Sequence, residues 1–164
     1  MAQAVNLSRR NLLRGRTGPA TVPIRPPGAI PEPLFADTCT SCDKCVAACP
    51  QEILFCGSGG YPEVDFRLGE CTFCNHCIDV CPEDALVSSI QPPWHLKLQL
   101  KDNCLAERQI VCQTCGDACE VEAIRFRPKI GRVAVPAIDP DVCTGCGACV
   151  AACPENALKA VAHG

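Results

Sequence analysis

The chain has 164 residues, a formal net charge of −3 and only 4% aromatic residues, so it offers little material for a large apolar core. A domain of roughly 60 residues is marginal on burial alone and usually depends on a metal or on cross-links. Cysteine occupies 17 positions, which indicates a scaffold built on thiols. No apolar run approaches the roughly 20 residues that span a bilayer, so we expect no membrane insertion.

The first 32 residues are predicted to form a basic, proline-rich and irregular N-terminal arm. The residues before Glu32 carry five arginines and no acid, which gives this segment a charge of +5 against −8 for the remainder. Such an arm is either disordered and solvated or a docking segment for an acidic partner surface, and the sequence leaves both open. The segment Ser8–Arg14 also resembles a twin-arginine export signal, but the apolar stretch that such a signal needs does not follow.

Residues 33–90 are predicted to form a first domain around two cysteine runs. The gaps within each run are two, two and three residues, and a proline follows the last cysteine, which is the ligand spacing of bacterial [4Fe–4S] sites. We expect a short helix before the last cysteine of each run. Two short strands over 53–55 and 61–66 are expected around the glycine turn Gly57–Gly60. The runs are Cys39, Cys42, Cys45 and Cys49, then Cys71, Cys74, Cys77 and Cys81.

Residues 98–161 are predicted to repeat this plan after a linker over 91–97, in which Trp94 is most simply a packing residue. Strands are expected at 123–126 and 133–139. Corresponding cysteines lie 70 and 72 positions apart (Cys49 to Cys119, Cys81 to Cys153), which indicates duplication of a two-cluster domain.

The second domain holds one irregular and one regular run. The regular run is Cys143, Cys146, Cys149 and Cys153. The irregular one is Cys104, Cys112, Cys115 and Cys119, in which the first gap has seven residues and Glu120 stands in place of the proline. This third run of the chain either holds a cluster in looser surroundings or is a degenerate motif.

The last cysteine of each run follows after about one helical turn, so it points away from the first three and binds the neighbouring cluster in two-cluster proteins. Crossing the last cysteines within each domain therefore gives four predicted ligand sets. The sequence predicts an α+β fold of tandem ferredoxin-like domains organised by four [4Fe–4S] clusters, or by three if the third run is degenerate. The sets are Cys39, Cys42, Cys45 and Cys81; Cys71, Cys74, Cys77 and Cys49; Cys104, Cys112, Cys115 and Cys153; and Cys143, Cys146, Cys149 and Cys119.

Other chemistry fits this pattern less well. Disulfide pairing would not require the same spacing between cysteines in every run, so it does not explain the repeat. Zinc sites rarely need a third and a fourth thiol at these spacings. Cys56 lies outside all runs and is expected to be a free thiol or an inert packing residue. His76, His95 and His163 are isolated, and each cluster already has four thiolates, so none is an expected ligand. No acid–base pair, nucleophile triad or phosphate loop is present, so we expect neither an enzyme nor a nucleic-acid partner.

The chain resembles the bacterial polyferredoxins over residues 34–160. The segments Ser8–Arg16, Ile24–Pro27, Gly59–Pro62 and Ala123–Pro128 resemble the NapF family, the ferredoxin-type proteins of periplasmic nitrate reductase systems. That resemblance implies a cytoplasmic iron–sulfur protein that assists maturation of the molybdenum-containing nitrate reductase catalytic subunit before its export. The alternatives are a general electron carrier or wire subunit that serves a redox partner protein, and a zinc scaffold for interaction. Thiol-rich cluster sites also favour a reducing compartment.

Overall fold

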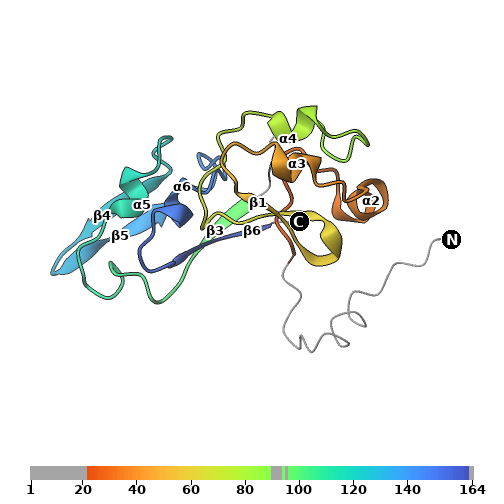
Figure 1. Ribbon diagram of the computed structural model, residues 1–164. Helices are drawn as coiled ribbons and strands as arrows, with labels where there is room; N and C mark the ends of the chain where they lie inside the picture. The colour runs from red at the N-terminus through yellow and green to blue at the C-terminus, as the bar shows by residue number, and fades with distance from the viewer. Residues whose placement is uncertain (1–21, 90–93, 95, 163–164) are drawn as a thin grey trace.

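The computed structural model describes residues 22–89, 94 and 96–162, and within them short helices alternate with two-stranded antiparallel sheets (Figure 1). We call residues 22–89 the first lobe and residues 96–162 the second lobe. The α+β class predicted from the sequence is confirmed. The elements are α2 (Glu32–Thr38), α3 (Lys44–Ala47), β1 (Leu54–Cys56), the 3₁₀ turn η1 (Ser58–Gly60), β2 (Pro62–Val64), α4 (His76–Asp79), β3 (Leu96–Leu100), α5 (Thr114–Asp117), β4 (Ile124–Lys129), β5 (Arg132–Ile138), α6 (Ala148–Ala151) and β6 (Leu158–Ala162).

Both predicted hairpins are present. Strand β1 pairs with β2, and β4 pairs with β5, each in antiparallel register. The first hairpin has three residues in each strand, whereas the second has six and seven, so the second extends farther from its lobe. The turn of the second hairpin contains Gly131 at a φ of +69°, a left-handed conformation that glycine adopts without a steric cost.

The third sheet was not predicted. Strand β3 pairs antiparallel with β6 at the other end of the lobe, and the partners Leu96↔Ala162, Leu98↔Ala160 and Leu100↔Leu158 put apolar residues on one face. The alternation of leucine with polar residues over 96–100 is the sequence signal for this strand. Leu96 and Lys97 therefore lie in a strand and not in the predicted linker. Residues 91–93 of that linker lie outside the described residues.

The end of the predicted arm is part of the first lobe. Arg25 donates to both carboxylate oxygens of Glu32 at 2.6 and 2.9 Å and to the carbonyl oxygen of Pro62 at 3.1 Å. Its guanidinium also lies 5.0 Å from the ring centroid of Phe35 and 5.3 Å from that of Tyr61. Only 11% of the side chain is exposed, so this arginine is neither solvated nor available for docking. The remaining arginines of the arm lie in residues 1–21, outside the described residues.

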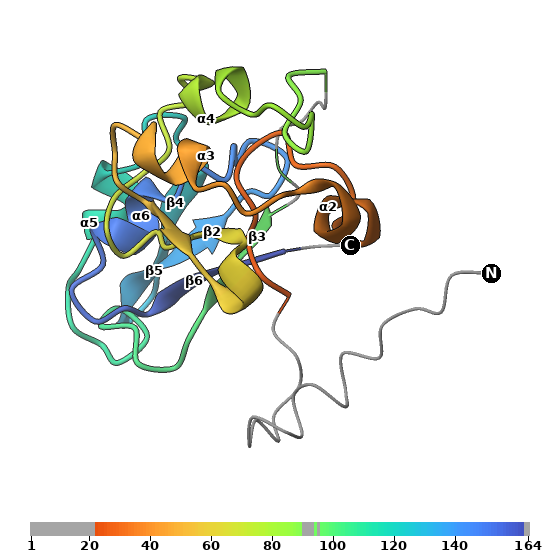
Figure 2. The same ribbon diagram turned by 45° about the vertical axis from the view of Figure 1, so that its right-hand side comes forward.

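The short helices lie in pairs, α3 beside α4 and α5 beside α6, as both views of the ribbon show (Figures 1 and 2). The lobes share one apolar core around Phe35, Ile53, Leu86, Trp94, Ile124 and Leu158. No helix among the described residues is long and apolar enough to cross a membrane.

Candidate metal centres

The three regular cysteine runs share one backbone conformation. In each, the residues on both sides of the second cysteine have a positive φ: Ser41 and Asp43, Phe73 and Asn75, and Gly145 and Gly147. Left-handed residues at these two places curl the chain so that the second cysteine and the next one, which lies in the following short helix, turn toward the same side. The last cysteine comes two residues after that helix ends. Neither Val111 nor Gln113 of the irregular run has a positive φ, so this loop takes a different path.

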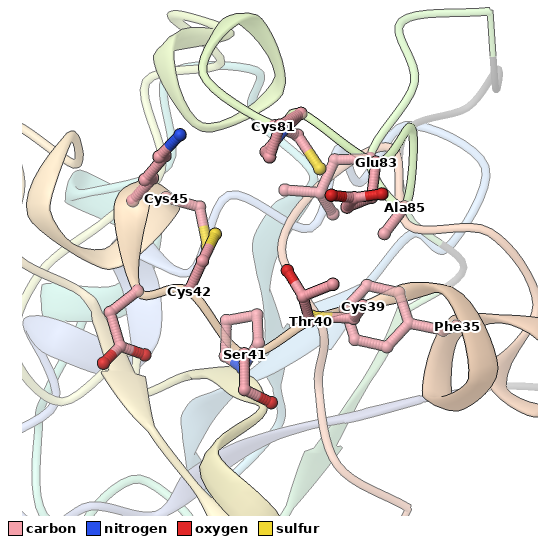
Figure 3. A pocket seen from close by; sticks show the side chains of 14 residues that line it. Phe35, Cys39, Thr40, Ser41, Cys42, Cys45, Cys81, Glu83 and Ala85 are labelled. Carbon is pink, nitrogen blue, oxygen red and sulfur yellow. The ribbon is translucent and has the colours of Figure 1, made fainter.

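The first predicted ligand set is brought together. Cys39, Cys42, Cys45 and Cys81 line one hollow of about 380 Å³, which includes space open to solvent. Figure 3 shows Cys81, from the segment after α4, across the hollow from the loop that carries Cys42 and Cys45. The buried side chains of Phe35 and Leu86 line the same hollow, so its floor is apolar.

The third set is brought together in the same way, although its run is irregular. Cys104, Cys112, Cys115 and Cys153 line a hollow of about 360 Å³ in the second lobe. Phe126 of β4, Pro136 of β5 and Leu158 of β6 complete its lining. The seven residues between Cys104 and Cys112 form a compact loop, in which the Arg108 N–H donates to the carbonyl of Cys104 at 3.0 Å. The loop therefore brings Cys104 to the hollow that it shares with Cys112, Cys115 and Cys153.

The second and fourth sets each contain one buried cysteine, Cys77 and Cys149. Burial raises the pKa of Cys77 to about 12, and the neighbouring thiols that add to the rise include Cys71, Cys74 and Cys49. Burial likewise raises the pKa of Cys149 to about 12, with Cys143, Cys146 and Cys119 among the contributing neighbours. In both cases the crossed last cysteine is one of the close thiols. The first and third sets thus each line one hollow, and in the second and fourth sets the four thiols lie near one another; the crossed assignment itself stays a prediction.

The turn after the last cysteine is the same in all four runs. The third residue beyond it has a positive φ in every case, at Glu52, Asp84, Glu122 and Asn156. The N–H of Ala123 donates to the sulfur of Cys119 at 3.3 Å, as that of Ala157 does to Cys153 at 3.2 Å. Glu120 therefore leaves this turn intact, and the proline of the other runs is not required for it.

These residues fit an iron–sulfur cube. Four neighbouring thiols, most of them at least partly buried, do not readily ionise side by side without a cation, and iron coordination supplies the positive charge that holds them as thiolates. No three Cys, His, Asp or Glu side chains among the described residues converge on a single metal ion. A cube binds each thiolate at a different iron and spreads the ligands farther apart than zinc does. The Nε1–H of Trp94 is buried and has no acceptor among the described residues, and a donor of this kind can serve a cluster sulfur.

The second and fourth sets adjoin each other across the two lobes. The N–H of Cys71 donates to the carbonyl of Cys146 at 2.8 Å. Trp94 packs edge-on to Phe66 at 5.3 Å between ring centroids and lies 5.6 Å from Phe73. A Cβ on Gly147 would overlap the ring of Phe66. Trp94 is thus the packing residue that the sequence predicts, and it lies where the two cysteine loops meet.

The remaining candidate residues lie apart from the sets. Cys56 is exposed, and its thiol donates to Asp43 Oδ1 at 3.1 Å. It lines neither hollow, which agrees with its exclusion from the ligand sets. His76 is an exposed residue of α4. His95 and His163 lie outside the described residues.

Comparisons with known proteins agree with this arrangement. The profile of the 4Fe-4S dicluster domain matches residues 37–85 and, a second time, residues 110–157. The chain is 42% identical to the ferredoxin-type protein NapF of Escherichia coli K12, over 95% of each chain. It is 44% identical to the ferredoxin-type protein NapF of Haemophilus influenzae, over 93% of each chain.

The chain belongs to the NapF family of ferredoxin-type proteins. It is also 34% identical to the ferredoxin-type protein NapG of Escherichia coli K12, over 80% of this chain and 66% of that protein. Membership confirms the tandem ferredoxin-like fold and two or more [4Fe–4S] clusters. Cys104 precedes the second match, so this one candidate ligand depends on the geometry of its own loop.

Proposed function

We propose that this protein is an electron-transferring iron–sulfur protein of the cytoplasm that assists maturation of a periplasmic nitrate reductase catalytic subunit before export. The protein assists by delivering electrons or by helping with cluster assembly, and it catalyses no reaction itself. The observation that carries the redox part of the proposal is the clustering of crossed thiols from distant parts of the chain. The nitrate reductase part is supported by the likeness to NapF proteins.

The proposed ligands are the 16 cysteines of the four sets, with Cys56 left out. They are Cys39, Cys42, Cys45, Cys49, Cys71, Cys74, Cys77, Cys81, Cys104, Cys112, Cys115, Cys119, Cys143, Cys146, Cys149 and Cys153. A [4Fe–4S] cluster held by such thiolates accepts and releases single electrons. The chain's own contribution is to exclude water with residues such as Phe35 and Trp94 and to aim backbone N–H groups at the sulfurs.

The arrangement of the loops supports electron passage between the lobes. Within each lobe the two sets lie close together. Cys45 of the first set helps to raise the pKa of Cys77 in the second set, and Cys115 of the third set helps to raise the pKa of Cys149 in the fourth set. Between the lobes, the hydrogen bond from Cys71 to Cys146 joins the second set to the fourth. The sets therefore follow one another in the order first, second, fourth, third. The two at the ends line the hollows that include space open to solvent.

Two experiments test the proposal separately. Anaerobic addition of dithionite to the cluster-loaded protein tests electron transfer, because the visible absorption should bleach and should return on oxidation. Affinity capture with the unexported catalytic subunit of the nitrate reductase tests the maturation role, with the same subunit lacking its export leader as the control. Reversible bleaching without capture favours the alternative, a general polyferredoxin carrier or wire subunit for an oxidoreductase. A colourless folded protein contradicts both.

A further inference from the structure

The β4–β5 hairpin carries an unusual charge for this chain. Residues 124–138 contain four cations and no acid, whereas residues 33–90 contain two cations and nine acids. The duplicated first lobe provides an internal comparison, because its hairpin over residues 54–64 contains one acid, Glu63, and no cation. The first hairpin therefore pairs its strands without positive charge, so the cations of the second hairpin are not required for strand pairing.

The arginines of the second hairpin have no side-chain partner among the residues that the structure describes. Arg125, Arg127 and Arg132 are exposed, and none of them has an ion pair or a hydrogen bond from its side chain within the described part of the chain. Arg25 and Arg67 of the first lobe, in contrast, each pair with a carboxylate. Ile130 at the hairpin tip is fully exposed and adds an apolar side chain among these cations. We call Arg125, Arg127, Ile130 and Arg132 the hairpin surface.

The opposite face of the same hairpin lies against the third ligand set. Phe126 and Pro136 line the hollow that Cys104, Cys112, Cys115 and Cys153 share. Phe126 also covers Gly116 of α5, where a Cβ would come within 2.9 Å of its ring. The hairpin surface is thus separated from a redox site by the thickness of one two-stranded sheet.

The loop before Cys112 extends this surface. The N–H of Val133 at the start of β5 donates to Gln109 Oε1 at 3.4 Å, which ties the loop to the hairpin. That loop exposes Ile110 and Val111, the latter with 78% of its surface accessible. Apolar groups beside exposed cations suit an interface in which charge speeds association and a small apolar contact holds the partner.

We propose that the hairpin surface docks an acidic redox protein that exchanges electrons with the third ligand set. This inference depends on the electron-transfer function proposed above. One electron leaves the reduced partner and enters a cluster held by this set; no bond forms or breaks and no proton is needed. Figure 1 shows the hairpin at the end of the molecule away from α2, so a partner bound there leaves the first lobe uncovered. A protein fits better than a lipid or nucleic-acid surface, because only a redox protein makes use of the adjacent thiols.

The test uses the full, cluster-loaded chain and reduced flavodoxin, an acidic one-electron donor, as the probe. In the triple variant Arg125→Gln, Arg127→Gln, Arg132→Gln, the second-order rate constant of cluster reduction should fall about tenfold at low ionic strength. The dependence of the rate on salt should also weaken. The matched control is Lys97→Gln with Lys159→Gln, two exposed cations of β3 and β6, which should keep the rate within about twofold. The single variant Ile130→Glu tests the tip without touching an arginine and should also slow the reaction.

The outcomes separate this inference from the function on which it depends. Dithionite reduction of the same samples should be equal in all variants, and its absence in the unmodified protein would overturn the electron-transfer function itself. Equal flavodoxin rates in the triple variant and the lysine control would overturn the docking surface alone. The surface would be assigned to a membrane instead if two results came together. The unmodified protein would bind phosphatidylglycerol vesicles and the triple variant would not, while the flavodoxin rates of the two proteins stayed equal.

Discussion

The substitution Gly147→Ala tests how tightly the two lobes are joined. Gly147 is buried, has a φ of +85° and directly precedes α6. A Cβ there would overlap the ring of Phe66, which is only 4% exposed. Trp94 packs edge-on against that ring, so the ring cannot move aside without opening the core.

The expected cost has two parts. A residue other than glycine in the left-handed region costs about 1–2 kcal/mol. An extra methyl group in a well-packed site costs about 1–3 kcal/mol. The free energy of unfolding should therefore fall by about 2–5 kcal/mol in all. Gly131 is the matched control, because its φ is +69° and a Cβ there would meet nothing within 4 Å. Gly131→Ala should lower the free energy of unfolding only by the backbone cost of about 1–2 kcal/mol.

The assay is anaerobic guanidinium unfolding of the cluster-loaded variants, followed by visible absorption and by circular dichroism. Gly147→Ala should unfold at the lowest denaturant concentration, Gly131→Ala at an intermediate one. Adding Phe66→Leu to Gly147→Ala should cost less than Phe66→Leu does in the unmodified protein, because the smaller side chain relieves the overlap. Equal midpoints for the two alanine variants would refute the packing argument.

Three further outcomes follow from the geometry. Cys153→Ser should lower the iron content by about four per chain, since it opens the third set; an unchanged value would show that Cys153 is not a cluster ligand. Cys56→Ser should leave iron content and dithionite reduction unchanged, because its exposed thiol lies outside the sets; loss of a cluster would make it a ligand. Arg25→Met should lower the free energy of unfolding by about 1–3 kcal/mol, whereas Arg67→Met, at an exposed pair, should leave it nearly unchanged, as denaturant titration can measure.

The sequence predicted the features that depend on short-range spacing. The gaps between cysteines determined the crossed sets, and the glycine turns located both hairpins. Cys104 could be assigned to the third run by counting cysteines alone. The path of the loop between Cys104 and Cys112 could not be predicted, because it depends on backbone hydrogen bonds such as that from the Arg108 N–H to the Cys104 carbonyl. The effect of Glu120 was also open, because the turn after Cys119 depends on the left-handed Glu122 and not on the residue that follows the cysteine.

The features that were missed depend on contacts between distant segments. Arg25 was counted among the charges of a loose arm, because its contacts with Pro62 and Tyr61 join segments more than 30 residues apart. The pairing of β3 with β6 joins the two ends of the second lobe, and periodicity can indicate a strand without naming its partner. The contact of Phe66 with Gly147 lies beyond sequence reasoning for the same reason.

Anaerobic iron and acid-labile sulfide analysis tests the four crossed thiolate sets most directly. With every set closed around a cube, each chain carries about 16 irons and about 16 sulfides. A homogeneous, folded preparation with about 12 of each would mean that one set stays open, and zinc in place of iron would contradict the account altogether.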